Sequence, residues 1–203
     1  SFPRDITSKM IDSMKNNTKV CRQLHLPVQS GSNRILKQMK RAYSVEWYRD
    51  SISKLRDAIP DLSLSTDIII GFSDESTKDF EETMQLIEDI KFDTIYSFKY
   101  SIRPGTPGEL MDSHVNEDVA LDRLHKLQSR QREISLENNL KQVNKSYKVL
   151  VESESKNNPN EFFGRTSQNK AVYIKNINKE SIGKILDITK KEAFQNSFIG
   201  EPT

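Results

Sequence analysis

The sequence holds a single cysteine, Cys21, among its 203 residues. One cysteine excludes an internal disulfide, and it also excludes a metal cluster held only by cysteines of this chain. Such cysteine usage suits a reducing compartment, so we expect a cytoplasmic protein. Cys21 itself stands alone in a strand-like segment and is predicted to be a buried structural residue.

Long apolar runs and a strong excess of one charge are also missing. No run approaches the roughly 20 apolar residues of a transmembrane helix, and the first residues do not resemble a signal peptide. Charged residues make up 30% of the chain and the mean hydropathy is −0.69, so we predict a soluble protein that does not bind a membrane. The net charge of +2 permits nucleic-acid binding without predicting it. The chain begins with Ser1 rather than with a methionine, and its first residues resemble an internal part of a longer chain, which indicates a fragment.

Strand-like and helix-like segments alternate from the N-terminus to about residue 115. Strands are predicted over residues 19–29, 62–71 and 94–103, with amphipathic helices between them. Ser76 and Asp79 have the spacing of a capping box at the start of one of these helices. Alternation of this kind favours a parallel sheet with helical crossovers.

Each predicted strand has one polar face, although a parallel strand buried on both faces should be apolar throughout. Ser63, Ser65 and Asp67, for example, alternate with apolar residues. Three such strands indicate part of a barrel whose interior holds a polar ligand. The alternative is a set of edge or antiparallel strands with a solvated face. Because so few strands cannot close a barrel of eight, we expect a rearranged sheet or self-association through open edges; the sequence does not fix the oligomeric state.

A long helix and a second, β-rich region follow. Asn116 is predicted to cap a helix over residues 116–144, with acids in its first turn, and this helix connects two domains. Residues 145–203 contain five short β-type runs separated by polar turns. This pattern fits a small all-β barrel of the oligonucleotide-binding type.

Several sequence strings, in the same order along the chain, resemble the radical S-adenosylmethionine methylthiotransferases. They are His-Leu-Pro-Val-Gln-Ser-Gly-Ser at 25–32, Met-Lys-Arg-Ala-Tyr-Ser at 39–44, Ser-Thr-Asp-Ile-Ile-Ile-Gly-Phe at 65–72 and Tyr-Ser-Ile-Arg-Pro-Gly-Thr-Pro at 100–107. Gly-Arg-Thr at 164–166, with Asn169 and Val172, resembles the RNA-binding TRAM domain. The resemblance covers essentially the whole chain and favours the branch that acts on isopentenyl-adenosine beside the anticodon.

The resemblance implies an α/β fold in three parts and a reaction. Residues 1–115 would be the C-terminal part of a TIM-type radical-SAM barrel, 116–144 a connecting helix, and 145–203 a TRAM domain with an OB-like fold. The enzymes of this family add a methylthio group to the base with S-adenosylmethionine and two iron–sulfur clusters, and their partner is the tRNA anticodon stem-loop. Such chemistry needs cofactors, because acid–base side chains do not activate an aromatic C–H bond.

Two departures from the family limit what the chain is expected to do. The cysteines that hold the clusters are missing, so we predict no catalytic residues, no metal ligands and an inactive fragment. Where the family has Pro-Gly in a Gly-Phe-Pro-Gly-Glu string, this chain has Ser73-Asp74, which alters the loop at the barrel mouth. Glu75 in this loop could simply favour the N-terminus of the next helix.

Two sets of site residues follow from the resemblance. Those expected to bind S-adenosylmethionine are Gln29, Ser30, Arg41, Asp67 and Gly71; those expected to bind RNA are Arg103, Arg165, Asn169, Lys170, Lys190 and Lys191. The alternatives are strand-end hydrogen bonding, capping and turn geometry for the first set, and ordinary surface charge for the second. Phe162, Phe163 and Tyr173 could stack on bases, but core packing is the simpler interpretation. His114 and His125 have no partner at metal-ligand spacing.

Two other functions remain open at this point. The chain could be a stand-alone RNA-binding module without catalysis, with the α/β part as scaffold. An unrelated α/β-barrel lyase or isomerase would need an acid–base pair at strand ends, for which His25 and Asp67 are the candidates.

Overall fold

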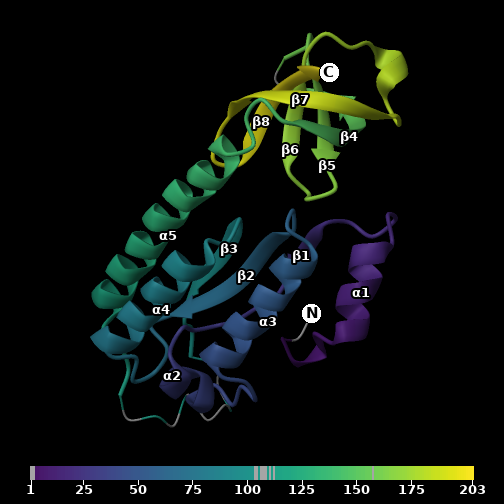
Figure 1. The fold of residues 1–203 in the computed structure, drawn as a ribbon. Coiled ribbons are helices and arrows are strands. Elements are labelled where there is room, and N and C mark those ends of the chain that lie inside the picture. Colours follow the sequence, from purple (N-terminus) through teal and green to yellow (C-terminus); the bar gives the residue numbers. More distant parts are fainter. Residues whose placement is uncertain (1–2, 103–104, 106–108, 110, 112, 157) are drawn as a thin grey trace.

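A computed structural model describes residues 3–102, 105, 109, 111, 113–156 and 158–203. It is a mixed α/β structure in which a long helix connects a helix-covered sheet to a small β-barrel (Figure 1). The elements of the first part are η1 (Pro3–Asp5), α1 (Ser8–Asn16), β1 (Gln23–His25), α2 (Asn33–Gln38), α3 (Val45–Ala58), β2 (Ser63–Ile70), α4 (Thr77–Ile90) and β3 (Thr94–Lys99). None of the helices in the described residues is long and apolar enough to cross a membrane.

The first part is a parallel sheet with the strand order β1-β2-β3, so the predicted parallel sheet with helical crossovers is confirmed. β1 is shorter than predicted at both ends, and it ends before Pro27, which has no N–H to donate. At this point the Thr66 hydroxyl replaces the backbone hydrogen bonds between the strands: it donates to Leu26 O (2.9 Å) and accepts from Val28 N (2.9 Å). Cys21 lies before β1 and is exposed, so its prediction as a buried strand residue is wrong.

The two faces of the sheet differ. One face packs against the helices through a core that includes Leu64, Ile68 and Ile70, all fully buried. The opposite face is open and carries polar residues of β1 and β2. On β3 the open face holds Tyr96 and Phe98, which are 52% and 56% exposed. The serine and lysine of β3 lie instead toward α5, which corrects the expectation that the polar residues of all three strands share one face.

Capping predictions made from the sequence are confirmed at two helices. Ser76 caps α4, and its side chain and that of Asp79 form the reciprocal bonds of a capping box. Asn116 caps α5 (Glu117–Leu140) through Asp118 N and Val119 N. α5 packs against β3 and α4 and ends next to the barrel (Figure 1).

The second part is a closed barrel with the strand order β4-β5-β6-β8-β7. Its elements are β4 (Ser146–Glu154), β5 (Phe162–Thr166), β6 (Ala171–Ile174), η3 (Lys179–Ser181), β7 (Ile185–Ala193) and β8 (Ser197–Pro202). Val149, Val151, Phe162, Val172 and Phe198 belong to its core. The predicted small all-β barrel is therefore confirmed, and closure leaves it no free sheet edge.

The barrel meets the sheet at the edge where the parallel strands begin. The turn between β5 and β6 reaches this edge: Gln168 Nε2 donates to Asp61 (3.1 Å), and Lys170 forms a 2.7 Å ion pair with Asp93. Asn139 of α5 donates to the carbonyls of Phe194 and Gln195 in the turn between β7 and β8. Contacts on two sides thus hold the barrel against the sheet and α5.

Candidate functional site

Two of the predicted cofactor residues lie side by side at the edge where the parallel strands end. Gln29 has a left-handed backbone (φ 76°), and its amide donates to Asp67 O (2.9 Å) while its carbonyl accepts from Ile69 N (2.9 Å). Ser30 follows but is fully buried, and its hydroxyl lies 3.4 Å from that of Thr83 and accepts from Ser32 N. The Asp67 side chain is therefore partly exposed on the open side of the sheet, whereas Gln29 is buried and the Ser30 hydroxyl points to α4.

A partly exposed polar cluster occupies the open face beside Asp67. His25 Nε2 lies 3.5 Å from the Asp67 carboxylate, and His25 Nδ1 lies 3.0 Å from Ser65 Oγ. The Tyr96 ring meets the imidazole edge-on, with centroids 5.8 Å apart. This group can exchange protons with a ligand or hydrogen-bond to it. No group of three or more metal-ligating side chains is found among the residues that the structure describes.

Gly71 belongs to a loop that a buried ion pair fixes to α5. Gly71 N donates to Glu75 Oε2 (3.0 Å), and Arg123 of α5 donates to the same oxygen (2.9 Å) and to Glu75 O (3.0 Å). The Glu75 side chain is 0% exposed and that of Arg123 is 9% exposed. Burial raises the pKa of Glu75, and the bonds from Gly71 and Arg123 act against it. Glu75 thus holds the loop rather than simply favouring the α4 N-terminus.

Replacing Gly71 with alanine should lower the free energy of unfolding by about 2–4 kcal/mol. Gly71 has φ +73°, and an added Cβ would lie 2.7 Å from Cβ of Ala120. Gly183→Ala is the matched control, since Gly183 has φ +82° but no atom within 4 Å of an added Cβ. The difference between the two variants in urea unfolding measures the contact with α5; equal losses would show that backbone strain alone decides.

The Ser73-Asp74 departure is accommodated by contacts of its own. Asp74 takes the left-handed conformation (φ 64°) at the position where the family string has glycine. Its carboxylate accepts from Arg34 (2.5 Å), which holds the pKa of Asp74 below its usual range. Ser73 is fully buried, and its hydroxyl lies 3.1 Å from His114 Nδ1. The loop is therefore fixed without the proline and the glycine.

Arg41 lies in the segment that follows α2. The neighbouring Tyr43 hydroxyl donates to Val28 O (3.1 Å), which places this segment against the residues that follow β1. Arg41 Nε is buried and has no hydrogen-bond partner in the described part of the chain. A buried donor without a partner suits an anionic ligand such as a carboxylate.

Three of the predicted RNA contacts, Arg165, Asn169 and Lys191, are exposed on the outside of the barrel. Arg165 donates to Asn169 Oδ1 (3.2 Å), and its guanidinium lies 5.2 Å from the centre of the Phe163 ring. Phe163 packs edge-on against Tyr173, with centroids 5.7 Å apart, and both are half-buried. Phe162 alone of the three aromatics is in the core, so core packing explains only one of them. Lys191 is exposed on β7, and Arg103 lies outside the described residues.

The other two lysines are engaged inside the molecule. Lys170 is paired with Asp93, and Lys190 is 0% exposed. The Lys190 ammonium lies 3.8 Å from the ring centres of both Tyr147 and Phe198 and donates to Gln142 (2.5 Å). Burial lowers its pKa to about 7. This placement does not suit a phosphate contact. The signal was present in the sequence, since Lys190 shares the strand face of buried Ile188.

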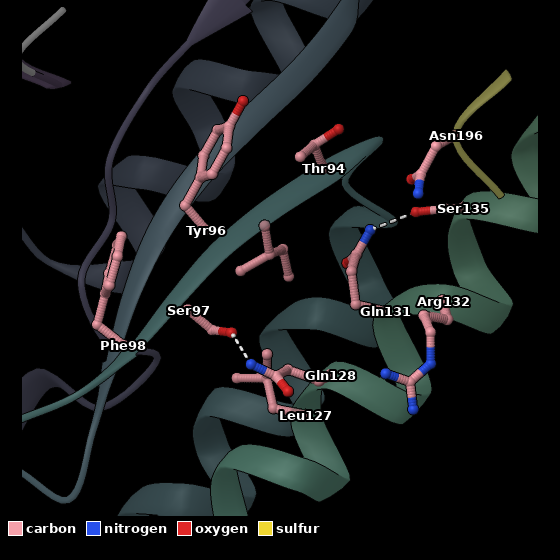
Figure 2. Close-up of a pocket in the computed structure, with 11 residues that line it drawn as sticks. Thr94, Tyr96, Ser97, Phe98, Leu127, Gln128, Gln131, Arg132, Ser135 and Asn196 are labelled. Atoms are coloured by element: carbon pink, nitrogen blue, oxygen red, sulfur yellow. Dashed lines mark hydrogen bonds between the residues drawn. The ribbon is translucent and has the colours of Figure 1, made fainter. Parts of the chain in front are cut away.

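A cavity of 340 Å³ lies between β3 and α5, where Figure 2 shows polar side chains of α5 facing β3. Gln128 donates to Ser97 (3.3 Å), and Gln131 donates to Ser135 (2.9 Å). Tyr96 and Phe98 line it as well. No sequence pattern indicates this cavity, because its walls are about 30 residues apart along the chain.

Comparisons with known proteins agree on both parts of the chain. Residues 1–87 match the Radical SAM superfamily, and residues 140–202 match the TRAM domain. Three curated tRNA-2-methylthio-N(6)-dimethylallyladenosine synthases align with this chain over 201 residues. The identity is 43% for the protein of Clostridium botulinum (strain Okra / Type B1), 42% for that of Clostridium tetani (strain Massachusetts / E88) and 41% for that of Alkaliphilus oremlandii (strain OhILAs). Each alignment covers 99% of this chain and 44%, 44% and 42% of the relative, respectively. The chain therefore spans less than half the length of these curated relatives.

Proposed function

We propose that this chain belongs to the radical S-adenosylmethionine methylthiotransferases and that it supplies the cofactor-rim and RNA-binding parts of a tRNA-modifying enzyme. The single observation that carries the proposal is the order of the two matches, Radical SAM at 1–87 and TRAM at 140–202, within one alignment over 99% of the chain. The intact enzyme would add a methylthio group to isopentenyl-adenosine beside the anticodon. Its partner would be the anticodon stem-loop, and we expect it in the cytoplasm.

The residues at the strand ends fit part of a site for S-adenosylmethionine. Asp67 presents a partly exposed carboxylate on the open face, and the buried Arg41 Nε offers an unused donor for a carboxylate. Gly71 is held in place by Glu75 and Arg123. When bound, the cofactor supplies a radical that side chains cannot generate. The part of the chain itself is to bind and orient the cofactor and to keep its loops fixed.

The same residues do not fit the iron–sulfur clusters. Such clusters are held by several cysteine thiolates, and the sequence contains only Cys21, which is exposed. No step of the reaction is therefore assigned to a residue of this chain. The three-stranded sheet would be one part of a TIM-type barrel whose other strands lie outside this sequence.

Mixing the chain with iron, sulfide and S-adenosylmethionine should give no deoxyadenosine above the level without protein. The reason is the missing thiolate ligands. Product analysis by chromatography measures this, with the full-length Clostridium tetani synthase as the positive control. Clear production of deoxyadenosine would overturn the proposal that this chain is only the rim of the site.

Binding to an anticodon stem-loop tests the RNA-binding half of the proposal. The dissociation constant should rise steeply with salt, because phosphate contacts release counterions. Arg165→Gln should weaken binding, since it removes an exposed cation beside two half-buried aromatic rings, whereas Lys9→Gln on α1 should not. No binding at any salt concentration would contradict this half.

A second candidate function is a stand-alone RNA-binding module. The closed barrel with its outer Phe163–Tyr173 pair favours it, because such a barrel needs no other domain for its core. It differs from the first candidate in one measurable way: a stand-alone module has no affinity for S-adenosylmethionine. Equilibrium dialysis with the labelled cofactor separates the two.

A further inference from the structure

A polar cleft of 520 Å³ lies between the barrel and the edge where the sheet strands begin. This is the edge opposite to the candidate cofactor rim. Its walls come from the ends of α3, α4 and α5, the start of β2, and the turn between β5 and β6. The cleft therefore joins segments that are more than 100 residues apart in the sequence, such as Asp61 and Gln168 (3.1 Å).

Cations outnumber acids in the lining of this cleft. Five basic residues face two acids, and the basic residues are Arg56, Lys91, Lys141, Lys145 and Lys170, with Asp61 and Asp93 opposite. Lys170 is paired with Asp93, and Lys91 is paired with Glu88 of α4. The two carboxylates of the lining therefore already have partners. Asp93 is paired with Lys170, and Asp61 accepts a hydrogen bond from the Gln168 amide.

Three of the cations have no ion pair in the part of the chain that the structure describes: Arg56, Lys141 and Lys145. Lys141 has a structural explanation, because it is the C-cap of α5 and a cation there is favoured by the helix dipole. Arg56 has none. It is half-buried, and this burial lowers its pKa, with the Asp93 charge acting in the opposite direction.

A partly buried guanidinium that contacts no carboxylate among the described residues is a costly arrangement unless an anion completes it. The planar fork of an arginine binds two oxygens of a phosphate at once. Lys145 lines the same cleft and adds a second positive charge, and Tyr147 also lines it. These groups belong to α3, to the segment between α5 and β4, and to β4, so that one anion would contact both parts of the molecule.

We propose that this cleft is a phosphate-binding site, in which Arg56 and Lys145 bind a phosphate group between the sheet and the barrel. The favoured source is the backbone of the RNA, and this choice rests on the proposed function. A free phosphate or a small phosphate ester has the same chemistry. The site lies outside the outer barrel face that carries Arg165, and it adds a contact that reaches the α/β part of the chain.

Charge-removing variants of the full 203-residue chain test the site. Arg56→Gln and Lys145→Gln should each weaken binding of an anticodon stem-loop, by roughly tenfold for Arg56. Each should also lower the slope of log Kd against log salt by about 1. The matched control is Lys78→Gln, since Lys78 is an exposed lysine at the other end of α4 from the cleft. Urea unfolding checks that the variants remain folded.

A titration with inorganic phosphate, followed by NMR, distinguishes the source. If RNA affinity falls in Arg56→Gln and Lys145→Gln but not in Lys78→Gln, the cleft binds the RNA backbone. If RNA does not bind to any form, the proposed function fails, but saturable phosphate binding that Arg56→Gln abolishes still supports the site. If folded Arg56→Gln and Lys145→Gln bind both RNA and phosphate as the parent does, or if neither ligand binds the parent, the inference is overturned.

Discussion

Replacing Arg123 with alanine should lower the free energy of unfolding by about 3–5 kcal/mol, because the change leaves a buried carboxylate without its cation. Glu75 is 0% exposed, and Arg123 is the cation that pairs with it. Without the guanidinium, the carboxylate either stays charged and buried or takes up a proton, and both outcomes destabilise the fold. Urea unfolding followed by circular dichroism measures the loss.

Two further variants separate the ion pair from general damage to α5. Arg132→Ala is the control on the same helix, since Arg132 is exposed and forms no ion pair among the described residues, and it should change stability by less than about 0.5 kcal/mol. Arg123→Met combined with Glu75→Gln should cost clearly less than the sum of the single changes, because no uncompensated charge remains. If Arg123→Ala costs under about 1 kcal/mol, the ion pair is not what holds the Gly71 loop against α5.

The second large effect concerns pH. The pKa of Lys190 falls from 10.5 to about 7 in the folded barrel because the ammonium is buried. Between pH 7 and pH 10 the unfolded chain therefore holds a proton that the folded chain has released. Stability should rise with pH through this window, by up to about 1.4 kcal/mol per pH unit and roughly 3–5 kcal/mol in total. Below pH 7 both states are protonated, and the contribution of Lys190 becomes constant.

The test compares Lys190→Met with Lys191→Met over pH 7 to pH 10. Lys190→Met should lose the pH-dependent rise, while Lys191→Met should keep it, because Lys191 is the adjacent exposed lysine. The rings of Tyr147 and Phe198 favour the ammonium and limit how far its pKa falls. Parallel pH profiles for the parent and Lys190→Met would show that these rings fully offset the cost of burial.

Local patterns in the sequence predicted local structure well. The capping residues Ser76 and Asn116 were found from their neighbours within three residues, and the small barrel from five short β-type runs between polar turns. Such features depend on contacts within a few residues. The end of β1 was not predicted, because it depends on a residue of another strand. The Thr66 side chain of β2 bonds to the backbone of Leu26 and Val28, on either side of Pro27.

The candidate site was harder to predict for the same reason. Glu75 and Arg123 are 48 residues apart, so no local pattern indicates that they share a bond. Strand alternation places Lys190 on the same face as Ile188 and so predicts that it is buried. The prediction of an RNA contact followed instead from its positive charge. The backbones of Gln29 and Asp67 are hydrogen-bonded to each other, and the role of these residues in cofactor binding stays a prediction.

The position of the barrel has a consequence for the size of an RNA ligand. The barrel contacts the edge where β2 begins, whereas Gly71 follows the end of β2, and this strand has eight residues. Eight residues of strand extend over about 26 Å. A ligand that contacts the interdomain cleft and delivers a base to the far edge must therefore extend at least that distance. Under the proposed function, a folded stem-loop spans this distance and a dinucleotide does not, so this architecture would favour a stem-loop over short RNA.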